Sequence, residues 1–284
     1  MSGTVVTGGT GQLGTAFRPL LLGAVFPSRS ELDLGRIDRI PAILDRLAPD
    51  TLVNCAAYTA VDAAETDQAA AFTVNAAAVG AMAAWCATRG ARFVTFSTDY
   101  VFDGTANRPY VESDPTCPIN AYGRTKEAAE RLALAANRAS LIIRTSWLIS
   151  GTHRNFVSAI LDRARHGTVR VVDDQHGCPT ITDDLAAGTL RALTADATGI
   201  LHLTSQGATT WYELARRAVE LADADPDLVR PTTSDAFPRP APRPHWSVLG
   251  SERLEGLGIE PLPPWEESLP AVVRQIAGSD GTGL

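Results

Sequence analysis

Lysine is almost absent from this sequence. Of the 25 basic residues in the 284-residue chain, 24 are arginines and one is a lysine, Lys126. An ammonium is a compact point charge on a flexible stem, whereas a guanidinium is wider and presents its donors in a fixed plane. Because arginine is used at every other basic position, Lys126 marks a place where an ammonium is required.

Other absences exclude whole classes of protein. The net charge of −7 argues against nucleic acid or an anionic membrane as the main partner. The one stretch that resembles a membrane span, residues 69–87, is mostly alanine and contains Thr73 and Asn75. We predict that it is a helix packed against a sheet. The first residues lack a basic segment, so we expect no signal peptide.

Cysteines are few, and their spacing is not that of a metal or redox motif. No CxxC pair occurs among Cys55, Cys86, Cys117 and Cys178. We therefore predict buried, reduced thiols in a cytoplasmic protein. The length suits one large domain, or one large and one small domain.

Short apolar strand candidates alternate with helical patterns through the first two-thirds of the chain. Strands are expected at residues 4–7, 24–27, 51–56, 92–98, 141–147 and 168–172. Helices are expected at residues 40–48, 67–88, 120–136 and 155–165. Continuously apolar strands indicate a parallel sheet covered on both faces. The alternation predicts an α/β fold of the Rossmann type, with a doubly wound parallel sheet.

A glycine-rich turn directly follows the first strand. Gly8, Gly11 and Gly14 have a GxxGxxG spacing between that strand and a helix. Such a turn lets the backbone approach a pyrophosphate, whose charge then lies at the helix N-terminus. The motif predicts a dinucleotide site, and a plain tight turn is the alternative.

The end of the second strand favours one form of the dinucleotide. An acidic residue there would bind the 2′-hydroxyl of NAD. This chain has Ser28 and Arg29 at that position, and Arg29 suits a 2′-phosphate. We predict NADPH as the cofactor, with NADH possible. A solvated loop arginine is the alternative.

Lys126 follows Tyr122 by four residues on a predicted helix, so both side chains share one face. A phenol is a poor proton donor or acceptor near neutral pH unless a nearby cation stabilises its phenolate. The lysine ammonium can do so and can also bind the nicotinamide ribose. A surface pair is the alternative. Thr98 ends an apolar strand, where ligands bind in open α/β sheets, and is the expected third catalytic group.

The pattern changes after residue 199. A strand and a helix at 211–222 are followed by ten of the 18 prolines, between residues 226 and 270. A disordered linker is the alternative, but Trp246 and Trp265 can anchor this segment. We expect residues 1–147, completed by part of 181–222, to form the NADP-binding domain. Residues 148–180 and 223–284 would form a smaller, partly irregular substrate-binding lobe.

At these residues the sequence resembles the extended short-chain dehydrogenase/reductases. Within them it is similar to the dTDP-4-dehydrorhamnose reductase family. The resemblance covers nearly the whole chain. It rests on the stretches "GGTGQLG", "VNCAAYTAVDAAE", "FSTDYVFDG", "NAYGRTKEAAE", "RTSWL", "DDQHGCPT", "GILHLTSQGATTWYELA" and "RPHWSVL".

The resemblance implies roles for individual residues. The implied cofactor-binding residues are Gly11, Gln12, Leu13, Asp33, Leu34, Ala56, Ala57 and Tyr58. The implied catalytic residues are Thr98, Tyr122 and Lys126, with Asp99 and Trp147 against the sugar nucleotide. Arg243 belongs to the matching "RPHWSVL" stretch and is expected to bind the substrate diphosphate. A solvated Arg243 is the alternative.

The resemblance also implies an activity. Similar sugar-nucleotide 4,6-dehydratases carry Thr-Asp-Glu, whereas this chain has Thr98, Asp99 and Tyr100. We therefore expect NADPH-dependent reduction of the 4-keto group of a dTDP-4-keto-6-deoxy sugar. The alternatives are a 4-ketoreductase for another deoxysugar of secondary metabolism and a non-catalytic regulatory subunit. Some relatives hold a metal at a dimer interface through a glutamate. The corresponding stretch "TAFRPLL" has no acid, so we expect no metal and a monomer or homodimer.

Overall fold

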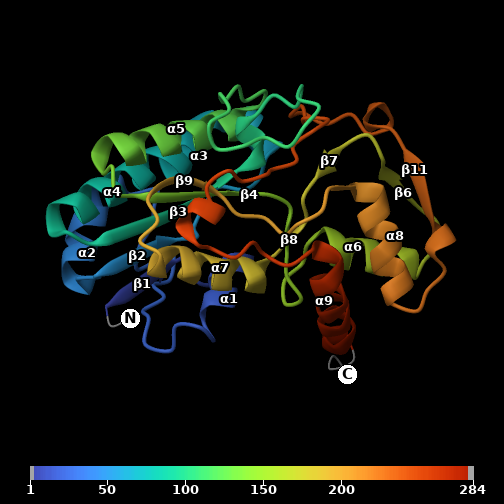
Figure 1. Cartoon of the computed structure of the whole chain (residues 1–284), viewed down its shortest axis with the longest axis horizontal. Coiled ribbons are helices and arrows are strands. Elements are labelled where there is room, and N and C mark those ends of the chain that lie inside the picture. Colours follow the sequence, from blue (N-terminus) through green and yellow to red (C-terminus); the bar gives the residue numbers. More distant parts are fainter. Residues whose placement is uncertain (1–2, 281–284) are drawn as a thin grey trace.

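A five-stranded parallel sheet forms the centre of the computed structural model, which describes residues 3–280 (Figure 1). The strands, in spatial order, are β1 (Thr4–Thr7), β2 (Thr51–Asn54), β3 (Arg92–Thr98), β4 (Leu141–Thr145) and β9 (Gly199–His202). Every neighbouring pair is parallel, so all carboxyl ends meet at one edge. The predicted α/β class is confirmed.

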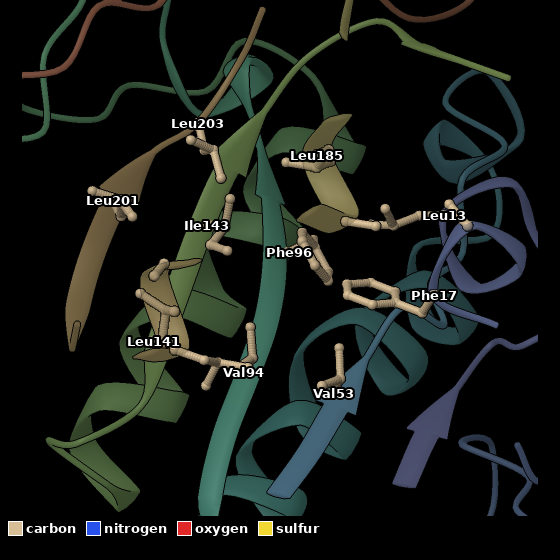
Figure 2. Close-up of a cluster of buried hydrophobic side chains, with 14 of the residues drawn as sticks. Leu13, Phe17, Val53, Val94, Phe96, Leu141, Ile143, Leu185, Leu201 and Leu203 are labelled. Carbon is tan, nitrogen blue, oxygen red and sulfur yellow. The ribbon is translucent and has the colours of Figure 1, made fainter. Parts of the chain in front are cut away.

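Helices cover both faces of this sheet. On one face lie α1 (Gln12–Phe17) and α7 (Thr182–Thr194), and on the other lie α2 (Ile40–Leu47), α4 (Ala78–Arg89) and α5 (Ala121–Ala136). Figure 2 shows the core on the α1 side, where side chains of β2, β3, β4 and β9 meet those of α1 and α7. Burial on both faces explains why the strands are continuously apolar.

The predicted strand at 24–27 is reduced to a single bridge. Val25 pairs with Val5 in parallel, and its N–H donates to the Thr4 carbonyl at 2.9 Å. Pro27 follows two residues later and has no N–H to continue the ladder. The bridge still places the chain on the side of β1 opposite to β2. The strand order therefore reverses at β1, and in open α/β sheets such a switch point is where ligands bind.

The predicted helix at 67–88 forms in three parts. α3 (Gln68–Phe72) continues through a π-helical turn, Thr73–Ala77, into α4. Buried Asn75 in this turn accepts from the Tyr58 N–H at 2.7 Å and donates to the Thr125 hydroxyl at 3.0 Å. By length and composition alone, Gln68–Arg89 could cross a membrane, but 50% of its apolar window is buried within the structure.

A second group of elements has its own apolar core. Its helices are α6 (Phe156–Ala164), α8 (Trp211–Leu221) and α9 (Trp265–Asp280). Its strand pairs are β6 (Val169–Val172) with β11 (Val229–Thr232), β7 (His176–Gly177) with β10 (Thr209–Thr210), and β5 (Leu148–Ile149) with β8 (Thr180–Ile181). This group is the lobe at the right of Figure 1. α7 and β9 belong to the main sheet, whereas α8 packs in the lobe.

The cysteines are all free, but their burial is not uniform. Cys86 and Cys178 are buried and Cys55 is partly buried, as expected. Cys117 is exposed, so the prediction of buried thiols is wrong for this residue. It lies in the irregular segment before α5.

Candidate active site

A cleft of about 860 Å³ opens at the carboxyl ends of the sheet strands. This size is typical of sites for small ligands. Its walls include the following residues predicted from the sequence: Gly8, Gly11, Gln12, Leu13, Arg29, Asp33, Leu34, Ala56, Ala57, Tyr58, Thr98, Asp99, Tyr122, Lys126 and Trp147. Gly14 lies behind the glycine turn, and Arg243 lies outside the lining of the cleft. The structure thus brings most of these predicted residues together around one cleft.

The glycine turn leaves no room for a side chain at Gly8 or Gly14. A Cβ on Gly14 would lie 2.1 Å from the Gly8 carbonyl oxygen, and Gly8 itself has a φ of 67°. Gly11 is the N-cap of α1 and no side chain caps this helix. The first N–H groups of α1 therefore stay available to a ligand at the cleft. These features fit the pyrophosphate of a dinucleotide.

Arg29 and Asp33 also line the cleft that contains the glycine turn. Arg29 is exposed at the rim, whereas the Asp33 carboxylate accepts from the Gly35 N–H at 2.9 Å. The N–H of Ser28 is bound by Glu31 at 2.8 Å, which fixes the turn before Arg29. A guanidinium at this place can pair with a phosphate on the adenosine ribose.

The N-terminus of α5 places the tyrosine and the lysine. Asn120 caps this helix by accepting from the Gly123 N–H at 2.7 Å. Tyr122 therefore lies in the first turn, and Lys126 follows one turn later on the same side. The Lys126 ammonium donates to the Phe96 carbonyl of β3 at 2.6 Å. Both residues line the cleft beside the end of β3.

Burial sets the protonation of this pair. It raises the pKa of Tyr122, with the Asp99 charge acting in the same direction and the Thr98 hydroxyl opposing it. Burial also lowers the pKa of Lys126 to about 8, and the attraction of Glu130 opposes this shift. At neutral pH the phenol therefore keeps its proton and the amine is mainly charged. This is the state that a proton donor needs.

Thr98 and Asp99 form a buried hydrogen-bonded pair at the end of β3. The Thr98 hydroxyl donates to Asp99 Oδ1 at 2.9 Å and accepts from the Tyr100 N–H at 3.2 Å. Burial raises the pKa of Asp99 to about 6. Asp99 Oδ2 has no hydrogen-bond partner in the described part of the chain. Asp99 is among the residues that line the cleft, but Oδ2 itself is buried.

Sequence reasoning missed a buried ion pair behind the catalytic helix. Arg144 of β4 binds Glu130 of α5 through two hydrogen bonds, of 2.9 and 2.7 Å. Ser97 Oγ donates to the same carboxylate at 2.5 Å. An arginine within a fully buried strand was the available signal, because a buried charge needs a partner. Glu130 also stands four residues after Lys126, on the same helix face.

Arg243 is bound to an acidic residue of the main domain. Its guanidinium donates to Asp62 Oδ1, and it also lies close to Tyr100. Hydrogen bonding to Arg243 lowers the pKa of Asp62. Arg239 approaches the same carboxylate at 3.7 Å, but its side chain is 64% exposed against 18% for Arg243. Arg243 is therefore neither a fully solvated residue nor part of the cleft wall.

A doubly wound sheet with a glycine cradle, a Tyr–Lys pair and a strand-end threonine defines a dinucleotide-dependent oxidoreductase. Residues 1–277 match the family model described as the RmlD substrate binding domain. The chain belongs to this family, and the family predicted from the sequence is confirmed.

Individual relatives match over most of their length. The chain is 48% identical over 241 residues to a probable dTDP-4,6-dihydroxy-2-methyloxan-3-one 4-ketoreductase of Streptomyces antibioticus, covering 84% of this chain and 82% of that one. It is 41% identical to the dTDP-4-dehydrorhamnose reductase of Burkholderia thailandensis, covering 96% and 98%. The crystal structure of dTDP-4-dehydrorhamnose reductase from Bacillus anthracis in complex with NADP superposes with a TM-score of 0.92. That protein is 30% identical, with 97% of this chain and 100% of that chain covered.

Proposed function

We propose that this protein uses NADPH to reduce the 4-keto group of a dTDP-4-keto-6-deoxy sugar. The observation that carries the proposal is the placement of Tyr122 one helical turn before the buried Lys126, in a cleft that also contains the glycine turn. Burial raises the pKa of Tyr122, as a proton donor requires. The names of the relatives from Burkholderia thailandensis and Bacillus anthracis support the substrate class, and the NADP of the latter supports the cofactor.

Each functional residue of the cleft has a separate role in the reaction. Bound NADPH supplies the hydride that reaches the carbonyl carbon. Tyr122 donates its proton to the carbonyl oxygen, so that the ketone becomes a secondary alcohol. The Lys126 ammonium stabilises the phenolate that is left, until solvent returns a proton. Thr98 is adjacent to Tyr122 and positions the carbonyl oxygen, while Asp99 lies beside Thr98 in the wall of the cleft.

Tyr100 supports reduction over dehydration. It takes the place of the glutamate of the dehydratases, and burial raises the pKa of its phenol, so it cannot supply the missing carboxylate. A 4-ketoreductase for another deoxysugar of secondary metabolism is the second candidate, favoured by the similarity to the probable 4-ketoreductase of Streptomyces antibioticus. A regulatory subunit would have no need of the Thr98–Tyr122–Lys126 set.

Domain roles and partners belong to the same proposal. Residues 1–147, completed by α7 and β9, would bind the cofactor, and the lobe, including α8, would bind the sugar nucleotide. Three further points stay predictions: the cytoplasmic location, the monomeric or homodimeric state, and the absence of metal, nucleic-acid and membrane partners. In the described part of the chain, no group of three or more His, Cys, Asp or Glu side chains could hold a metal ion.

The decisive experiment is a turnover assay with an identified product. Purified protein is mixed with NADPH and dTDP-4-keto-rhamnose, oxidation of NADPH is followed by absorbance, and the product is identified by NMR. We expect an alcohol at C4. A different 4-keto sugar nucleotide as the better substrate would favour the second candidate. No NADPH oxidation with any of them would contradict the proposal.

Arg29 is expected to set the preference for NADPH. Arg29→Ala removes one charge-assisted contact with the 2′-phosphate, worth about 1.5–3 kcal/mol, and should raise the KM for NADPH about ten-fold or more. The KM for NADH should not change. Arg36→Ala is the matched control, because Arg36 is exposed in the same segment but does not line the cleft. An unchanged ratio of the two KM values would make Arg29 a solvated loop residue.

Arg243 is expected to bind the diphosphate of the sugar nucleotide, which would compete with Asp62 for the guanidinium. Arg243→Ala should raise the KM for the sugar nucleotide about ten-fold or more, since one charge-assisted bond is worth ~1.5–3 kcal/mol. The KM for NADPH should stay as in the wild type. Arg239→Ala, at the exposed partner of the same Asp62, should have little effect. Loss of folding or of NADPH affinity, with the sugar KM intact, would give Arg243 a structural role instead.

A further inference from the structure

Trp147 has an uncommon backbone conformation. Its φ is 47°, a region that bulky residues rarely occupy and that clusters at functional sites. Trp147 stands between β4 of the main sheet and β5 of the lobe, and its carbonyl accepts from the Thr180 N–H at 3.1 Å. The unusual turn carries the chain from one part of the molecule to the other. It also leaves the indole in the wall of the cleft.

Two residues of the lobe hold this indole in place. The Trp211 ring stacks on it with centroids 3.6 Å apart and planes 8° apart. The Gly177 backbone lies so close that a Cβ there would be 2.5 Å from Trp147 Cε2. β7 and β10 pair in antiparallel fashion, so Gly177 lies opposite Thr209 and Trp211 follows β10 directly. The paired strands β7 and β10 therefore place both Gly177 and Trp211 against the Trp147 indole.

The stacking partner is itself firmly anchored. Trp211 is the first residue of α8, and the capping box of Thr210 and Glu213 fixes the start of that helix. The Thr210 hydroxyl also donates to Asp173 Oδ1 at 2.7 Å. Phe156 of α6 packs on Trp211 with ring centroids 4.5 Å apart. Trp211 does not line the cleft, so it can affect a ligand only through Trp147.

We propose that Trp211 and Gly177 are positioning residues that fix the Trp147 indole as one wall of the sugar site. This inference rests on the proposed function, because the ligand of that wall is the sugar of the nucleotide substrate. A planar apolar face suits the ring of a 6-deoxy sugar, which has a methyl group in place of a hydroxymethyl group. A fixed indole then determines how the ketone meets Tyr122.

The test compares Trp211→Ala, Trp211→Phe and Gly177→Ala in the full chain. A small displacement of a positioning group can cost about 10²-fold, so Trp211→Ala should lower kcat/KM for the sugar nucleotide by about that factor. Its KM for NADPH should not change. Trp211→Phe should recover part of the loss because an aromatic face remains. Gly177→Ala pushes the indole aside and should also lower kcat/KM for the sugar nucleotide while leaving the KM for NADPH unchanged. This variant tests the proposal even if Trp211→Ala does not fold.

Far-ultraviolet circular dichroism gives a second measurement that does not depend on turnover. Two stacked indoles produce an exciton couplet, which Trp211→Ala should abolish and Trp85→Phe, a distant control on α4, should leave intact. Binding of dTDP-glucose, measured by calorimetry, should weaken in Trp211→Ala. If Trp211→Ala binds dTDP-glucose more weakly but the wild type turns over no sugar nucleotide, only the proposed function is contradicted, and the positioning role stands. Unchanged dTDP-glucose affinity and kcat/KM in Trp211→Ala would overturn the positioning role.

Discussion

Lys126→Arg is expected to lower kcat by at least ~10²-fold although it conserves the charge, because this is the low end of what positioned acid–base groups supply. The ammonium is buried and donates to the Phe96 carbonyl at 2.6 Å. A guanidinium is wider and planar, and cannot reach that carbonyl and the phenolate of Tyr122 from the same stem. The phenolate would lose its stabilising neighbour, and proton donation would slow.

The control for this variant is the opposite exchange on the same helix. Arg131 is exposed on α5, so Arg131→Lys should leave kcat and both KM values unchanged. Thermal unfolding of both variants separates a catalytic loss from a loss of folded protein. Near wild-type turnover by a folded Lys126→Arg variant would remove the reason offered for the single lysine of this chain.

Local sequence features predicted the parts of the site that neighbouring residues determine. The cradle of Gly8, Gly11 and Gly14 follows from a strand–turn–helix context, and the spacing of Tyr122 and Lys126 follows from the helical period. The five strands of the main sheet followed from their apolar runs, whereas the strand expected at 24–27 is only a single bridge. Each of these signals lies within about one supersecondary unit.

The features that were missed depend on contacts between distant segments. The π-helical turn at Asn75 forms where this side chain binds both the Tyr58 loop and α5. The stack of Trp147 on Trp211 needs the lobe to fold back to β4. The partner of Arg243 is Asp62, which lies 181 residues away. Neither composition nor periodicity contains such pairings, because they depend on the assembled topology.

Glu130→Ala is expected to destabilise the protein by about 3–5 kcal/mol, because it leaves a buried arginine without its partner. The side chains of Arg144 and Glu130 are only 5% and 6% exposed, and two hydrogen bonds join them. The remaining guanidinium contacts, with His202 at 3.3 Å and over the Phe102 ring, offer no negative charge. Guanidinium chloride unfolding, followed by circular dichroism, measures the change in the free energy of unfolding.

An exposed arginine–glutamate pair provides the control. Arg217 and Glu220 are 2.5 Å apart but 40% and 57% exposed, so Glu220→Ala should cost no more than about 1 kcal/mol. Glu130→Leu combined with Arg144→Met should recover much of the stability, because the double variant buries no unpaired charge.

Glu130 also attracts the Lys126 ammonium and joins Ser97 of β3 to α5. Because Thr98 follows Ser97 in β3 and Tyr122 lies on α5, the buried pair also helps to hold Thr98 in line with Tyr122. A Glu130→Ala variant as stable as Glu220→Ala would show that the buried pair contributes nothing to holding the two catalytic elements together.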